Sequence, residues 1–99
     1  MSDMHRPAHP GELLKNGWID ELNISVTSAA KNLGLSRKHL SNIINQKAGV
    51  SADVSMRLGK WTGVSSQLWL DMQSAWDLWQ LRDIDYAINK LNHQQTMHL

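Results

Sequence analysis

The sequence predicts an all-α domain of about five helices, followed by a helical C-terminal extension. Apolar residues recur at intervals of three and four through most of the chain, which is the period of an amphipathic helix. Both prolines lie within the first ten residues, so no proline ring interrupts the later helices. Ninety-nine residues with 41% hydrophobic side chains and a mean hydropathy of −0.41 predict one small soluble domain, 1–99, and exclude a large enzyme fold.

The first two helices are predicted from the residues at their ends. Pro10 suits the first position of a helix and Glu12 its first turn, and the apolar line of this helix runs through Leu14, Trp18 and Leu22. Ser25 can cap a second helix, which Gly34 ends. The buried face of the second helix would consist of Val26, Ala29, Ala30 and Leu33.

Serines also precede the third and fourth predicted helices. Ser36 caps the third helix, whose inward side chains are Leu40, Ile43 and Ile44. Ser51 caps the fourth, which ends near Gly63 and has Val54, Leu58 and Trp61 on its core side. Gly59 inside this helix costs on the order of 1 kcal/mol relative to alanine, so we expect the fourth helix to depend on packing.

The fifth helix begins at Ser65 or Ser66 and has two apolar stripes. The first stripe contains Leu68, Trp69, Met72, Ala75, Trp76 and Trp79, and the second continues through Leu78, Leu81, Ile84, Ile88 and Leu91. Packing Leu68, Met72 and Trp76 against the domain leaves a contiguous apolar patch uncovered. We therefore predict a dimer interface formed by Leu78, Trp79, Leu81, Ile84 and Ile88. The alternative is that the arm after Arg82 folds back onto its own core.

Residues 26–44 have the spacing of a helix-turn-helix. Ala30 is the small residue where the two helices cross, and Gly34 occupies the turn. Apolar residues flank that glycine and recur in the next helix, namely Leu33, Leu35, Leu40 and Ile43. The alternative is a helical hairpin without affinity for DNA, which does not explain the polar, basic outer face of the third helix.

Charge is distributed unevenly along a chain whose net charge is only +1. Residues 31–60 have six basic side chains and one acidic side chain, whereas each of the flanking segments has two basic and four acidic side chains. No acidic residue occurs from Leu22 to Ala52. The middle of the chain is therefore the part predicted to face an anionic partner.

Several short motifs resemble those of the Xre/lambda-repressor-like superfamily and, within it, the HigA (VapI-type) antitoxins. The resemblance covers about residues 8–82. Its motifs are His9-Pro10-Gly11-Glu12-Leu13-Leu14, Ser25-Val26-Thr27 with Ala30, Leu33-Gly34-Leu35-Ser36-Arg37, Ser51-Ala52-Asp53 with Arg57-Leu58, Leu68-Trp69-Leu70 and Asp77-Leu78-Trp79. The chain departs from the family pattern at Gly59, Thr62 and Ser66, where the family usually has alanine, an apolar residue and proline.

The resemblance implies a dimeric repressor that binds a palindromic double-stranded DNA operator, autoregulates its operon and neutralises a toxin of ribonuclease type. The helix-turn-helix supports the DNA-binding half of this interpretation, and the toxin partner follows from the resemblance alone. Two alternatives remain at this point. One is a stand-alone repressor of phage or plasmid type, and the other is a helical adaptor that binds no DNA.

In a helix-turn-helix the third helix enters the major groove with its outer face toward the bases. That face predicts base contacts from Arg37, Lys38, Ser41, Asn42 and Asn45, because guanidinium and ammonium groups suit guanine and amides suit adenine. Predicted phosphate contacts come from Ser25 and Thr27 at the start of the second helix, from Ser36, and from Lys47 beyond the third helix.

Other functions are disfavoured by composition. The chain has no cysteine, which excludes a disulfide scaffold and a thiolate metal site, and we expect a cytoplasmic protein. No apolar run suits a signal peptide or a membrane span. His5 and His9 lie four residues apart, but no further ligand has metal-site spacing, so no metal, cofactor or catalytic residue is predicted.

Overall fold

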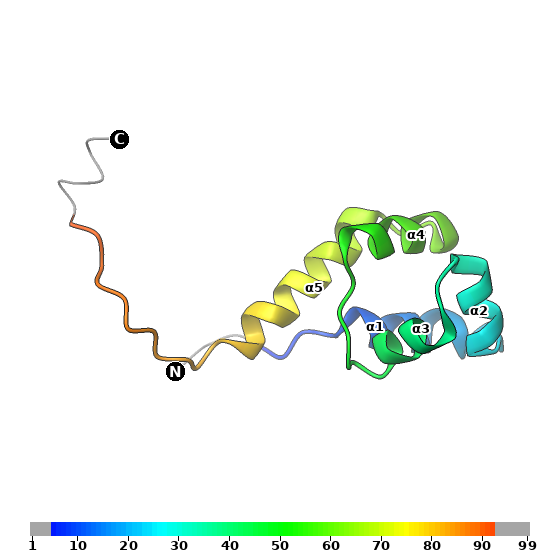
Figure 1. Ribbon diagram of the computed structural model, residues 1–99, viewed down its shortest axis with the longest axis horizontal. Helices are drawn as coiled ribbons and strands as arrows, with labels where there is room; N and C mark the ends of the chain where they lie inside the picture. Colours follow the sequence, from blue (N-terminus) through cyan, green and yellow to red (C-terminus); the bar gives the residue numbers. More distant parts are fainter. Residues whose placement is uncertain (1–4, 93–99) are drawn as a thin grey trace.

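The computed structural model describes residues 5–92, and within them the fold is all-helical (Figure 1). Five α-helices follow one another: α1 (Pro10–Leu14), α2 (Val26–Leu33), α3 (Arg37–Ile44), α4 (Ala52–Thr62) and α5 (Ser66–Gln80), with a π-helical turn, η1 (Lys15–Ile19), directly after α1. All five α-helices contribute to a single core, and α5 adds Trp69 to it near its start before leading away from the other helices (Figure 1). The predicted fold class of about five helices is confirmed.

The predicted serine caps at the starts of α2 to α5 and the predicted glycine ends of α2 and α4 are confirmed. Each helix is preceded by a serine whose Oγ accepts a backbone N–H from the first turn, the four caps being Ser25, Ser36, Ser51 and Ser65. Gly34 and Gly63 follow α2 and α4 with φ of 69° and 79°. An L-residue is strained at such angles, so glycine is the residue that ends both helices without cost.

The first helix differs from its prediction because η1 adds a residue to one turn. A π-turn places residues five apart on the same face, so Ile19, and not Leu22, follows Leu14 into the core. Ile19 is 3% exposed, whereas Leu22 is 60% exposed. The predicted inward position of Leu22 is therefore wrong, and Trp18 is half-buried beside Trp69, at 5.7 Å between ring centroids.

Two glycines permit close approaches between helices. A Cβ on Gly11 would overlap the carbonyl oxygen of Ile43, so the start of α1 lies directly against the end of α3. A Cβ on Gly59 would overlap Oγ of Ser66 and lie 3.2 Å from the Ser66 nitrogen. Gly59 therefore lets the first residue of α5 pack onto α4, which explains a residue that is otherwise unfavourable inside a helix.

The inward side of α5 is shifted from its prediction. Trp69 is fully buried, Met72 and Trp76 are half-buried, and Leu68 is 48% exposed. The expected burial of Leu68 is wrong because neighbouring positions of a helix point in different directions, and it is Trp69 that enters the core. Within the described residues, no helix has the length and apolar character needed to cross a membrane.

The predicted helical extension after α5 is also wrong as far as residue 92. The helix ends at Gln80, where Arg82 donates to the Trp79 carbonyl at 2.8 Å and its guanidinium covers the Trp79 ring at 3.8 Å. Residues 84–92 are exposed and extended (Figure 1). A short helix needs a surface to pack on, and no other element within residues 5–92 supplies one there. The rest of the predicted tail, 93–99, lies outside the described residues.

His9 is the N-cap of α1, a role that its sequence position did not suggest. Its Nδ1 accepts the Gly11 N–H at 2.9 Å, and its ring meets the Trp76 ring edge-on at 5.1 Å. Only 2% of the residue is exposed. Burial lowers the pKa of His9 below its usual value of 6.5, and the Asp77 and Glu12 carboxylates oppose this shift only in part. His9 is therefore held neutral, with Nδ1 free of a proton.

The depressed pKa of His9 predicts acid sensitivity. The unfolded chain binds this proton near pH 6.5 and the folded chain only at lower pH, so the stability from neutral His9 is complete above pH 6.5 and is lost as the pH falls below it. Denaturation midpoints between pH 7.5 and pH 5 should fall more steeply for the wild type than for His9→Asn, which keeps an N-capping oxygen but does not titrate. Equal slopes for the two proteins would contradict this assignment.

Candidate nucleic-acid interface

The helix-turn-helix of α2, its turn and α3 forms as its spacing predicts. Leu35 N donates to Ala30 O at 2.9 Å and Gly34 N to Lys31 O at 3.2 Å, which together make the Schellman motif that reverses the chain after α2. Ala30, Leu33, Leu40 and Ile43 are all buried, and Leu35 packs on their cluster. Because α3 buries this side, its opposite side faces solvent.

The outer face of α3 presents cations at its start and amides further along. Arg37 and Lys38 are exposed, and Ser41 and Asn42 are half-buried. Asn45 is exposed, but its amide nitrogen donates to the Ser41 carbonyl at 2.9 Å and to Ser41 Oγ at 3.3 Å. Asn42 makes no such side-chain bond among residues 5–92. Asn42 is therefore the amide whose donor and acceptor are both available for an adenine edge.

The predicted phosphate-binding residues lie at the ends of α2 and α3. Ser25 Oγ caps the Ser28 N–H at 3.0 Å, and Ser36 Oγ caps the His39 N–H at 3.0 Å. Thr27 is exposed in the first turn of α2, and Lys47 is exposed beyond the end of α3. Both capping serines are exposed, so the N-termini of α2 and α3 face solvent, where helix N–H groups can bind phosphate oxygens.

Ion pairing leaves the basic charge of this region uncompensated. The ion pairs of the described residues involve Arg6, Lys15, Arg57 and Arg82. Six other cations, all exposed, have no carboxylate partner there: Lys31, Arg37, Lys38, Lys47, Lys60 and Lys90. The first four lie in the stretch 22–52. The stretch without acidic residues therefore presents positive potential to solvent, which attracts a polyanion.

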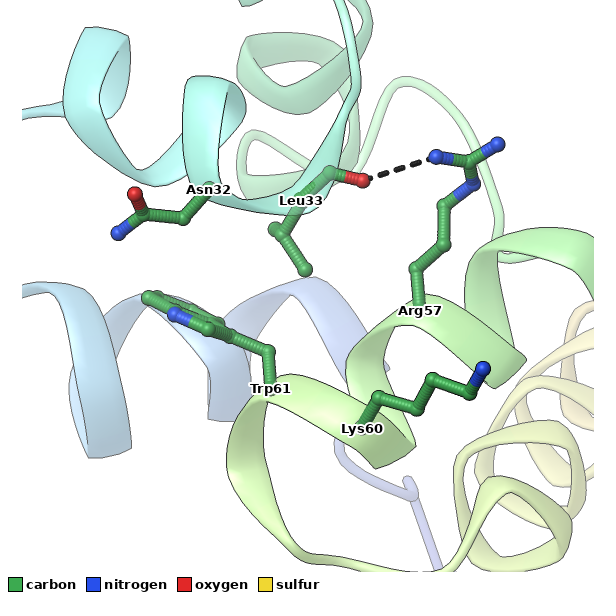
Figure 2. Close-up of a pocket in the computed structure, with 5 residues that line it drawn as sticks. All are labelled: Asn32, Leu33, Arg57, Lys60 and Trp61. Carbon is green, nitrogen blue, oxygen red and sulfur yellow. Dashed lines mark hydrogen bonds between the residues drawn. The ribbon is translucent and has the colours of Figure 1, made fainter.

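Arg57 is the residue of this region that sequence reasoning missed. It lies on α4, yet its Nη1 donates to the carbonyls of Leu33 at 3.0 Å and Gly34 at 3.3 Å, in the turn before α3. It also lines an open pocket of about 290 Å³ between α2 and α4, together with Asn32, Leu33, Lys60 and Trp61 (Figure 2). The only sequence signal was the Arg57-Leu58 pair among the family motifs.

An α2–turn–α3 unit with a polar, basic outer face and a buried inner face defines a helix-turn-helix DNA-binding protein. Comparisons with known proteins agree. The chain is 43% identical over 79 residues to virulence-associated protein A′ of Dichelobacter nodosus, covering 79% of this chain and 68% of that protein. It is 35% identical over 79 residues to antitoxin HigA-1 of Vibrio cholerae, covering 79% of this chain and 73% of that one. The chain belongs to the HigA (VapI-type) antitoxin family.

A solved structure supports the same assignment. The Pseudomonas aeruginosa antitoxin HigA, determined with the higBA promoter, superimposes with a TM-score of 0.73 at 30% sequence identity. The match covers 84% of this chain and 100% of that chain. A search of family models found no match.

Proposed function

We propose that this chain is a sequence-specific DNA-binding antitoxin, which represses its own operon as a homodimer on a palindromic operator and neutralises a ribonuclease toxin. The single observation that supports DNA binding best is the outer face of α3, where Arg37 and Lys38 have no ion-pair partner within residues 5–92. Family membership supports the toxin partner.

In the proposed complex α3 lies in the major groove. Arg37 and Lys38 donate to guanine, and Asn42 offers an amide to adenine, with Ser41 and Asn45 further along the same face. Asn45 contributes through its amide oxygen, because its nitrogen is bonded within α3. Ser25, Thr27, Ser36 and Lys47 hold phosphates on either side of the groove.

Binding to the DNA upstream of the gene that encodes this chain tests the proposal. A random duplex of equal length is the reference. We expect a clear preference for the upstream region, and the logarithm of the affinity should fall with the logarithm of salt concentration at about −0.9 per neutralised phosphate. Equal affinity for the two duplexes would refute the proposal that this chain is a sequence-specific regulator.

Asn42 and Lys47 should behave differently when each is replaced by alanine. Asn42→Ala removes a base contact, so operator affinity should fall about 5- to 150-fold (about 1 to 3 kcal/mol) while random-duplex affinity stays unchanged. Lys47→Ala removes a phosphate contact, so both affinities should fall alike and the salt slope should shrink by about 0.9. Fluorescence anisotropy titrations at several salt concentrations measure both quantities. A uniform loss for Asn42→Ala would contradict its role.

A homodimer is proposed because one helix-turn-helix makes few contacts and two can read half-sites about 34 to 36 Å apart. An uncovered apolar surface supports this. Leu78, Leu81, Ile84 and Ile88 are 63%, 46%, 50% and 76% exposed. Trp79 is half-buried beneath Arg82. Residues 84–92 do not fold back onto the core, so none of the residues that the structure describes covers the patch.

Co-expression with the product of a neighbouring open reading frame tests the proposal that this chain neutralises a toxin. Stable co-purification and relief of growth arrest are the expected results. A chain that binds its operator and has no such neighbour would instead be a stand-alone repressor.

A further inference from the structure

The Schellman turn between α2 and α3 does not itself satisfy the backbone carbonyls of Leu33 and Gly34. Its own hydrogen bonds use the carbonyls of Ala30 and Lys31. Further along the chain, Leu33 O and Gly34 O receive Nη1 of Arg57 from α4. Figure 2 shows the bond to Leu33 O. A cation at this place also suits the negative end of the α2 dipole. The guanidinium of Arg57, from another helix, therefore supplies the hydrogen-bond donor for these two carbonyls of the turn.

The guanidinium is held in place from two sides. Asp53, one helical turn earlier on α4, accepts its Nε–H at 2.9 Å. Gly34 leaves the space that the guanidinium occupies, since a Cβ there would lie 2.6 Å from Nη1. The planar guanidinium binds a carboxylate with one edge and backbone carbonyls with another. A lysine ammonium does not reproduce this geometry.

The helix from which Arg57 extends is itself firmly packed. Leu58, the next residue, is fully buried, and Gly59 lies against the first residue of α5. Ser36, two residues after Gly34, is the N-cap of α3. The Arg57 bonds therefore connect α4 to the turn that directly precedes α3, the helix on which Arg37 and Lys38 lie.

We propose that Arg57 is a positioning residue for operator recognition: it fixes the start of α3 relative to α4 and does not itself bind DNA. This inference rests on the proposed DNA-binding function. Base-edge hydrogen bonds require accurate placement of α3, whereas phosphate contacts by long flexible cations tolerate displacement. Loss of Arg57 should therefore reduce sequence preference more than general affinity for DNA.

Arg57→Gln tests the proposal, with Lys60→Gln as the matched control. Lys60 lies on the same helix and lines the same pocket, and its loss removes the same charge without touching the turn. For Arg57→Gln we expect operator affinity to fall at least about tenfold, random-duplex affinity to stay within about twofold, and the salt slope to remain unchanged. Lys60→Gln should match the wild type. Arg57→Lys keeps the charge and should recover little of the operator preference.

The contrary results are equally definite. If Arg57 binds phosphate, Arg57→Gln lowers both affinities together, the salt slope shrinks by about 0.9, and Arg57→Lys restores binding. Retained operator preference in a folded Arg57→Gln protein also overturns the proposal. If that variant is unfolded by circular dichroism, Asp53→Asn takes its place, because it frees the guanidinium without removing it. The same pattern at smaller amplitude is expected, and wild-type preference in Asp53→Asn overturns the proposal.

A measurement without DNA separates this inference from the proposed function. In Arg57→Gln, backbone amide shifts and hydrogen-exchange rates should change mainly at 33–38, and Lys60→Gln should leave them unaltered. If the wild-type protein shows no preference for its operator, the proposed regulatory function is refuted. The amide shifts and exchange rates at 33–38 still decide whether Arg57 holds the turn. Unchanged amides at 33–38 overturn the positioning role whatever the DNA result.

Discussion

Gly11→Ala should destabilise the domain more than the same substitution at any of its other five glycines. The new Cβ would overlap the Ile43 carbonyl oxygen, and a backbone atom inside α3 cannot turn away as a side chain can. We expect a loss of about 3 kcal/mol or more, at the upper end of the usual cost of overpacking. For a domain of this size that corresponds to a fall in Tm of more than about 12 °C. Thermal denaturation followed by circular dichroism measures it.

Gly17→Ala is the matched control for this change. Gly17 lies in η1 and is exposed, and an added Cβ would meet only Leu13 Cδ1 at the ordinary distance of 3.5 Å. Because alanine has less freedom than glycine in the unfolded chain, we expect no loss of stability there. A Gly11→Ala protein as stable as Gly17→Ala would mean that α1 and α3 do not lie as close as described.

Charges placed in the exposed patch of α5 should convert the protein into a folded monomer that binds its operator weakly. Leu78→Asp combined with Leu81→Asp puts two carboxylates where the proposed partner copy packs, while both positions are solvent-exposed within one chain. Folding should therefore survive and association should not. Two linked half-site contacts bind with an affinity about 10² to 10⁴ times that of one contact, so we expect operator affinity to fall at least about 100-fold.

Light scattering and anisotropy titration together test the dimer. The wild type should have twice its chain mass of 11.2 kDa at micromolar concentration, and the double variant only that mass. Leu68→Asp is the control, because it makes the same exchange at an exposed position near the other end of α5. A wild-type protein of 11.2 kDa that binds its operator tightly would refute the dimer.

The features that sequence reasoning predicted correctly are those set by residues near one another in the chain. A serine cap needs only an N–H two or three residues further on, and a left-handed C-cap needs only glycine. The apolar spacing of the helix-turn-helix likewise lies within 26–44. Which face of α3 is polar followed from this spacing, so the candidate interface was accessible before the structure.

The features that sequence reasoning missed depend on contacts between distant segments or on an irregular helix. Arg57 reaches carbonyls that lie 24 and 23 residues earlier, and no local pattern indicates that pairing. A 3.6-residue period throughout the first helix predicts that Leu22 lies in the core. The π-turn breaks this period and places Ile19 there instead. The apolar spacing after Leu81 was compatible with a helix, but a compatible spacing does not provide the surface on which a short helix depends.

The contact between Gly59 and Ser66 has a consequence for how this chain can evolve. The family to which it belongs usually has alanine at 59 and proline at 66, so the chain departs from the family pattern on both sides of one contact. An alanine methyl at 59 would overlap the Ser66 hydroxyl and lie 3.2 Å from the Ser66 nitrogen and from the Val64 carbonyl oxygen. The hydroxyl can rotate away but the backbone atoms cannot, so the effect on stability of a substitution at either position should depend on the residue at the other.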